Sequence, residues 1–140
     1  RLPEVLKRTS ELSKEYGLQV ANVFHAGDGN MHPLILYNAN NPGELERTEE
    51  LGGKILEICV AVGGTITGEH GVGIEKINQM CVQFDKDELE QFRAIKRAFD
   101  PQELLNPGKG IPTPRRCSEY RALSPGGGGS EPGNSGEGVA

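Results

Sequence analysis

The stretch LQVANVFHAGDGNMHPLILY, residues 18–37, decides the fold, because it predicts a β-hairpin. The segment Leu18–His25 is rich in β-branched and aromatic residues, as strands are, and His32–Tyr37 has the composition of a partner strand. Between them, residues 27–30 are Gly-Asp-Gly-Asn, which is strong turn chemistry. We interpret Asp28 and Asn30 as residues whose short side chains set this turn.

Helical periodicity surrounds the hairpin. Apolar residues at helical spacing predict a helix over Leu2–Tyr16, which Gly17 ends, and another over about Glu44–Val62. Asp85 and Glu88 form a capping-box pattern before a helix to Phe99, whose apolar stripe is Leu89, Phe92, Ile95 and Phe99. Weaker signals predict a short strand over Thr65–Thr67 and short helices over Ile74–Met80 and Gln102–Leu105. The pattern indicates an α+β fold, an antiparallel sheet with helices on one side.

Composition and charge exclude several classes of protein. The chain has 140 residues and a net charge of −5 without a basic cluster, so it has no electrostatic footprint for nucleic acid. No apolar run approaches the ~20 residues of a membrane-spanning helix. The three cysteines share no C-x-x-C spacing, which predicts reduced thiols in the cytoplasm. Cys59 lies on a helical apolar stripe and is expected in the core, whereas Cys81 and Cys117 have no evident partner.

Both ends of the chain differ from the middle. Helical periodicity already begins at Leu2, behind an arginine, which suggests the C-terminal piece of a longer protein. Residues 113–140 are rich in Gly, Pro and Ser, and such a segment buries too little apolar surface to offset its chain entropy. We therefore expect one partial domain over residues 1–112 and a disordered tail over 113–140.

The histidines carry the sharpest functional signal. All three, His25, His32 and His70, lie in glycine-rich turns, within the motifs HAGDGNMH and TGEHGVG. If the hairpin closes symmetrically, His25 faces His32 directly, with Cβ atoms ~5 Å apart, and both could bind one metal ion. Glu69 is the candidate third ligand, and two histidines with one carboxylate leave an open coordination position. The alternative interpretation is a hydrogen-bonded histidine pair without a metal.

Period-two alternation predicts what surrounds the two hairpin histidines. It places Ala21, Val23, Leu34 and Leu36 on the same face of the hairpin as His25 and His32. An apolar wall that leads to a polar point is typical of a small-ligand pocket.

Three motifs together resemble a known family. HAGDGNMHP (residues 25–33), GGTITGEHGVGIEK (63–76) and FDPQELLNPGK (99–109) are similar to the C-terminal domain of FAD-linked 2-hydroxy-acid oxidases, the glycolate oxidases above all. That group includes the D-lactate and D-2-hydroxyglutarate dehydrogenases. The resemblance covers roughly residues 1–112 and implies the cap, or substrate, domain of the vanillyl-alcohol-oxidase-like flavoproteins.

The resemblance also implies roles for particular residues. The family's metal ligands correspond to His25, His32 and Glu69, and its active-site histidine, which contacts substrate, corresponds to His70. Asn106 in the LNPGK turn is expected on the flavin side, as a cofactor-binding residue. Leu34 stands where the 2-hydroxyglutarate enzymes have a substrate-binding asparagine, which favours a small substrate.

The expected function follows from these residues and the resemblance. It is the flavin-dependent oxidation of glycolate or a small D-2-hydroxy acid, such as lactate, to the 2-oxo acid. FAD would be held mostly by an N-terminal flavin domain, with zinc as the first metal by ligand type and manganese or iron next. An iron–sulfur subunit or another acceptor would take the electrons, and the chain alone would be inactive. The alternatives are a metal-dependent hydrolase and a non-catalytic metal-binding fragment.

Overall fold

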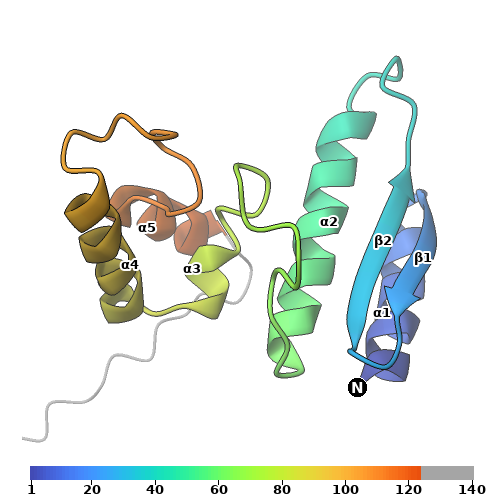
Figure 1. Cartoon of the computed structure of the whole chain (residues 1–140). Coiled ribbons are helices and arrows are strands. Elements are labelled where there is room, and N and C mark those ends of the chain that lie inside the picture. Colours follow the sequence, from blue (N-terminus) through green and yellow to red (C-terminus); the bar gives the residue numbers. More distant parts are fainter. Residues whose placement is uncertain (124–140) are drawn as a thin grey trace, which may run out of the picture.

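A computed structural model describes residues 1–123 of the chain. In chain order its elements are α1 (Leu2–Tyr16), β1 (Gln19–His25), β2 (Asn30–Leu36), α2 (Glu44–Ala61), α3 (Met80–Gln83), α4 (Lys86–Phe99) and α5 (Pro114–Leu123) (Figure 1). The two strands form an antiparallel sheet. Because α1 and α2 pack against one face of it, the expected α+β class, with helices on one side, is confirmed.

The first core cluster joins the hairpin to the two long helices. Leu18, Leu51 and Ile55 are buried, with Val20 and Ile35 of the hairpin packed against them. Helix α1 can turn directly into β1 because Gly17 adopts the left-handed conformation, with φ of 63°. This arrangement covers one face of the hairpin at Val20 and Ile35 and turns its other face outward.

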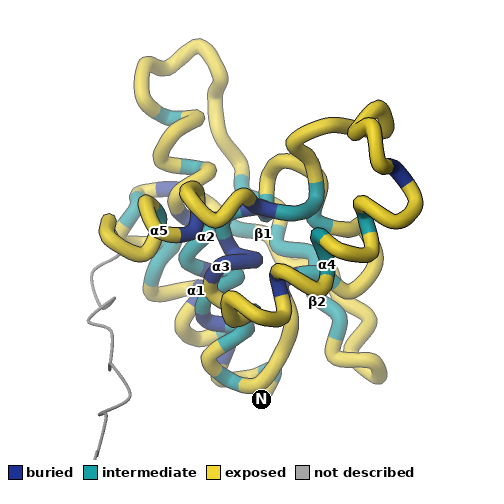
Figure 2. Tube along the Cα trace, turned by 90° about the vertical axis from the view of Figure 1, so that its left-hand side faces the viewer, coloured by how far each residue is buried: buried dark blue, intermediate teal, exposed yellow. Residues whose placement is uncertain are grey.

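Helix α2 also contributes to a second core cluster on its opposite side. Leu56 and Val60 pack against buried residues of the later elements, which are Ile66, Met80, Cys81, Leu89 and Cys117. Accordingly, α2 lies between the hairpin with α1 and the group α3–α5 in Figure 1. In Figure 2 the buried segments, in dark blue, lie mainly around α1, α2 and α3.

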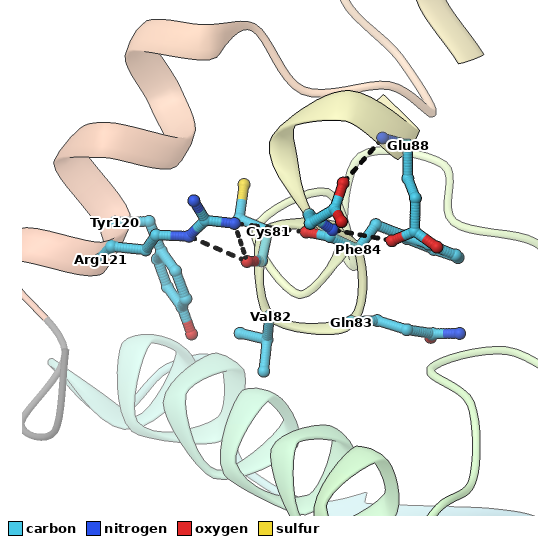
Figure 3. Close-up of a pocket in the computed structure, with 8 residues that line it drawn as sticks. Cys81, Val82, Gln83, Phe84, Glu88, Tyr120 and Arg121 are labelled. Carbon is cyan, nitrogen blue, oxygen red and sulfur yellow. Dashed lines mark hydrogen bonds between the residues drawn. The ribbon is translucent and has the colours of Figure 1, made fainter. Parts of the chain in front are cut away.

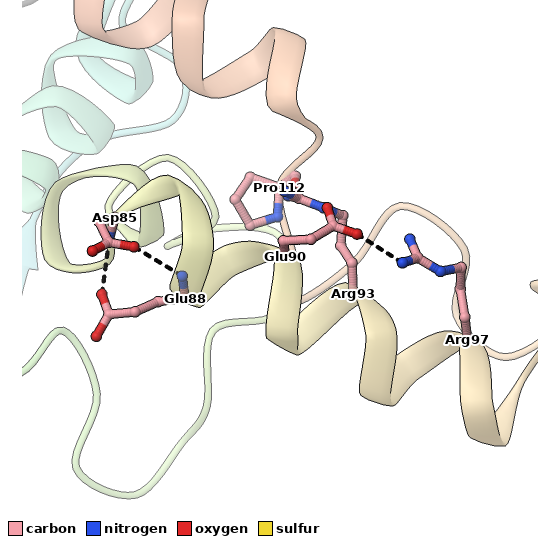
Figure 4. A network of polar contacts seen from close by, with 6 residues as sticks. All are labelled: Asp85, Glu88, Glu90, Arg93, Arg97 and Pro112. Carbon is pink, nitrogen blue, oxygen red and sulfur yellow. Dashed lines mark hydrogen bonds and ion pairs between the residues drawn. The ribbon is translucent and has the colours of Figure 1, made fainter.

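Helix α4 begins and ends as its sequence dictates. The predicted capping box is present: the Asp85 carboxylate accepts from the Glu88 backbone N–H, and the Glu88 carboxylate accepts from that of Asp85 (Figure 4). On the exposed side, Glu90 accepts hydrogen bonds from Arg93 and Arg97. Only part of the predicted apolar stripe packs in the core, since Leu89 is buried while Phe99 is 84% exposed.

Three predicted short elements are absent from the described residues. Thr65–Thr67 is not a strand, because the Gln83 side chain accepts the Ile66 backbone N–H that a neighbouring strand would take. Residues 74–79 form turns, and helix α3 begins only at Met80. The helix expected over 102–105 is replaced by a loop that Asp100 holds.

Asp100 organises that loop with one buried carboxylate. It accepts hydrogen bonds from the backbone N–H groups of Leu104 and Leu105 and from Lys96. The Lys96 ammonium, with these backbone donors, holds the pKa of Asp100 below its ordinary value. The loop therefore has an anchored start although it contains no helix.

The chain after residue 112 differs from its expectation. Helix α5 covers 114–123, where composition predicted disorder, and Cys117 forms a disulfide with Cys81. The expectation of reduced thiols is therefore wrong for this pair, and only Cys59 is free. Arg121 adds two hydrogen bonds to the Cys81 carbonyl oxygen (Figure 3). The rest of the expected tail, 124–140, lies outside the described residues.

Candidate metal and active site

The outward face of the hairpin carries both hairpin histidines. The pairing is His25 with Asn30 and Val23 with His32, so the two histidines are diagonal neighbours, and the expected direct opposition is wrong. The reason is the turn, which comprises residues 26–29 and is two residues shorter than a direct His25–His32 pairing would leave. In it the Asp28 N–H donates to the His25 carbonyl, and Gly29 adopts φ of 70°. A shift of two residues preserves the face, and the ring centroids of His25 and His32 are 5.4 Å apart.

Glu69 approaches these histidines from the loop between α2 and α3. Its Oε1 lies 3.6 Å from His25 Nε2, and its Oε2 lies 3.9 Å from His32 Nε2. One ligand atom from each of the three residues falls within 4.8 Å of the others. The fold thus brings together the three residues that the sequence predicted as metal ligands.

His70 lies beside the same cluster but outside the three-residue group. Its ring stacks on that of His32, with centroids 5.2 Å apart, and its Nε2 is 3.8 Å from Glu69 Oε2. The His70 side chain is 71% exposed, whereas that of His32 is 21% exposed. His70 is therefore the imidazole of the cluster that is most open to a ligand from solvent.

The loop that carries Glu69 is anchored on both sides of it. Ile66 is buried in the second core cluster, and its N–H donates to the Gln83 side chain. On the other side, the Gly71 N–H donates to Thr67 Oγ1. Further on, the Gly73 carbonyl accepts from Gly110. These contacts hold the loop backbone and leave the direction of the Glu69 carboxylate to other groups.

Asn30 is the site residue that sequence reasoning missed. Its side-chain Nδ2 donates to Glu69 Oε1 over 2.5 Å, so it is more than a turn residue. The available signal was period two, because Asn30 shares the face of His32 two positions later. Gly68 belongs to the same contact, since a Cβ there would lie 2.8 Å from Asn30 Oδ1.

The predicted apolar wall is present on the histidine face. The register pairs Ala21 with Leu34 and places Val23 and Leu36 on the same side. In this chain the wall faces solvent: Val23, Leu34 and Leu36 are each more than half exposed. Leu34 is separated from His32 by one residue of β2, which places it next to His32 on the histidine face.

Within residues 1–123, Asn106 takes no part in the contacts that join the histidine cluster. It sits in the loop between α4 and α5 with φ of 47°, and its carbonyl accepts from the Lys109 N–H. The side chain is exposed and, among residues 1–123, makes no hydrogen bond to the histidine cluster. A cofactor role for Asn106 therefore depends on parts beyond those described.

Comparison with known proteins defines the class. Residues 1–110 match the family model "FAD linked oxidases, C-terminal domain". The chain therefore belongs to this family, as its three motifs predicted. None of the described helices is long and apolar enough to cross a membrane.

Relatives within the family are glycolate oxidase subunits and D-lactate dehydrogenases. The chain is 67% identical over 122 residues to glycolate oxidase subunit GlcD of Escherichia coli K12, covering 87% of this chain and 24% of that protein. It is 38% identical to the Bacillus subtilis GlcD, over 77% of this chain and 23% of that protein. It is 39% identical to the D-lactate dehydrogenase of Archaeoglobus fulgidus, over 78% of this chain and 24% of that protein. The chain spans about a quarter of the length of these relatives.

Proposed function

We propose that this chain supplies the substrate- and metal-binding part of a flavin-dependent enzyme that oxidises glycolate or a small D-2-hydroxy acid, such as lactate, to the 2-oxo acid. The observation that carries the proposal is the convergence of His25, His32 and Glu69 on one outward face of the hairpin. The relatives named as glycolate oxidase subunits and D-lactate dehydrogenases support the substrate class.

The donor set fits a divalent metal ion. Two ligands each ~2.1 Å from an ion lie about 3.4 Å apart at a tetrahedral angle. The nitrogen-to-oxygen distances of 3.6 and 3.9 Å are close to that spacing and longer than hydrogen bonds. Imidazole with carboxylate suits zinc first, and manganese or iron next. A bound ion would act as a Lewis acid toward the substrate's carboxylate and hydroxyl.

His70 is the proposed general base. Its Nε2 faces the cluster at the solvent-exposed edge, where it could take the proton from the hydroxyl of a 2-hydroxy acid. The stacking on His32 orients the ring and keeps Nε2 beside the ligand group. FAD, proposed to be held mostly by an N-terminal flavin domain, would supply the redox chemistry of hydride acceptance.

Leu34 is proposed to limit substrate size and charge. It lies on the histidine face next to the cluster and offers no partner to a second carboxylate. Burying such a charge without a partner is costly, so glycolate or lactate is favoured over a dicarboxylate.

The remaining parts of the proposal rest on the sequence and the family. Asn106 would contact the cofactor from the LNPGK turn, and an iron–sulfur subunit or another acceptor would take the electrons. The chain alone is proposed to bind no flavin tightly and to be inactive. A cytoplasmic location is also proposed, although the Cys81–Cys117 disulfide weighs against it, because such bonds persist mainly in oxidising compartments.

A chimera tests this function. The 122 matched residues would replace the corresponding quarter of the E. coli glycolate oxidase subunit. Oxidation of glycolate, D-lactate and D-2-hydroxyglutarate would then be measured with an artificial acceptor. We expect His70→Asn to lower kcat by about 10²–10⁴-fold with metal and flavin retained. Leu34→Asn should shift kcat/KM toward the dicarboxylate. Full activity of the His70 variant, or an unmodified chimera that prefers the dicarboxylate, would contradict the proposal.

A further inference from the structure

Asn30 joins the two segments that build the candidate site. It is the first residue of β2, pairs with His25, and lies on the same face as both hairpin histidines. Its amide donates to Glu69, and within residues 1–123 this is the one hydrogen bond between the hairpin and the loop over 62–79. We propose that Asn30 is the positioning residue that aims the Glu69 carboxylate at a bound cation, an inference that rests on the proposed metal site.

The backbone of the turn does not require asparagine at this position. The turn residue with positive φ is Gly29, whereas Asn30 has an ordinary strand conformation. Any residue with good strand propensity would satisfy the hairpin there. The side chain of Asn30 is therefore explained by what it contacts rather than by the turn.

The Asn30 amide lies between the Glu69 carboxylate and the backbone of Gly68. A carboxylate only accepts hydrogen bonds, so the NH₂ end of the amide must face Glu69. The Oδ1 end then lies against the backbone of Gly68, where a Cβ would approach it to 2.8 Å. Gly68 thus keeps open the space that the amide occupies.

The position of the Asn30 amide sets the direction of the whole Glu69 carboxylate. Asn30 holds Oε1, the oxygen nearest His25, and so fixes Oε2 on the side of His32 and His70. An uncharged amide orients Glu69 without neutralising it, whereas a lysine or arginine would compete with the cation for its charge. Hydrogen bonds of this kind to ligating carboxylates typically tune metal affinity 10–100-fold.

Zinc titration of the whole 140-residue chain tests the inference. Asn30→Ala should weaken Zn²⁺ binding about 10–100-fold in a calorimetric titration, with the urea midpoint nearly unchanged. Gly68→Ala should also weaken binding, because it displaces the amide. The double variant should bind no more weakly than Asn30→Ala alone, since both changes remove one contact. Asn22→Ala is the matched control, because Asn22 lies on the other face of the same hairpin.

A second measurement does not depend on metal. In the metal-free chain, side-chain ¹³C relaxation of Glu69 should show greater mobility in Asn30→Ala but not in Asn22→Ala. Unchanged zinc affinity in Asn30→Ala, with a wild-type chain that binds zinc, would overturn the inference. If the wild-type chain binds no divalent ion, the proposed metal site is wrong. In that case unchanged mobility would overturn the positioning role too, and increased mobility would uphold it.

Discussion

The hairpin side and the α3–α5 side of this molecule are held together in different ways. On the hairpin side, three buried residues form the core cluster. The site residues His25 and His70 are 59% and 71% exposed. On the α3–α5 side, the cluster has five buried residues, two of them the disulfide-bonded cysteines, and a capping box begins α4. The candidate site residues are thus exposed, and the larger buried cluster lies on the α3–α5 side.

Helix α2 connects these two sides through polar contacts as well. The Tyr120 hydroxyl of α5 donates to Glu57 of α2 and accepts from Gln79. Toward the hairpin, Tyr16 of α1 donates to Glu50 of α2. Helix α2 therefore contacts both sides of the molecule, and the candidate site lies at the exposed edge of the hairpin side.

Removing the disulfide should produce the largest change in stability. Cys81 and Cys117 are 36 residues apart, and the chain-entropy relation for a loop of this size gives about 4 kcal/mol. We therefore expect the double variant Cys81→Ser with Cys117→Ser to lose roughly 3–4 kcal/mol of unfolding free energy in urea. Cys59→Ala is the control for loss of a thiol without loss of a bond.

The same variant also probes how separate the two sides are. If the hairpin side is independent of α5, zinc affinity should change less than about twofold under native conditions, since distant sites act additively. A loss of affinity as large as the loss of stability would show instead that the disulfide supports the site.

Removing a proposed ligand should act on the hairpin side alone. His32→Ala should weaken Zn²⁺ binding by more than about 100-fold. This loss exceeds the loss expected when a residue that only hydrogen-bonds to a metal ligand is replaced. Zinc at 100 times its Kd should stabilise the wild-type chain by about 2.7 kcal/mol and should not stabilise the variant. His70→Asn is the matched control and should keep the ion. Equal zinc stabilisation of the wild type and His32→Ala would contradict the assignment.

The sequence predicted elements with strong local signals and missed those set by distant contacts. Periodicity and caps located α1, α2 and α4, because these signals lie within each helix. Helix α5 was missed, since a polar, proline-led segment becomes stable only when Cys117 and Arg121 attach it to α3. Likewise, periodicity could not show that Phe99 stays exposed, because burial depends on which neighbours are present.

The candidate site follows the same rule. Face and parity were predictable, so His25, His32 and Leu34 share the expected side of the hairpin. The register was not predictable, because it depends on where the turn closes. Glu69 was expected from its neighbourhood in sequence, but its bond to Asn30 joins residues 39 positions apart, and no local pattern encodes such a contact.

The smallest expected effect concerns the contact between α1 and α2 at alkaline pH. Burial, with the hydrogen bond to Glu50, raises the pKa of Tyr16 from 10.0 to about 12. Because the folded pKa is the higher one, this stabilisation is fully present below pH 10 and is lost as the pH rises toward 12. Tyr16→Phe should therefore be less stable than the wild type at pH 8 but lose less stability between pH 8 and 11, as urea midpoints would measure. Tyr37→Phe, which changes an exposed tyrosine, should lose as much stability between pH 8 and 11 as the wild type does. Identical pH profiles for the wild type and Tyr16→Phe would show that this contact does not help to hold the hairpin side to α2.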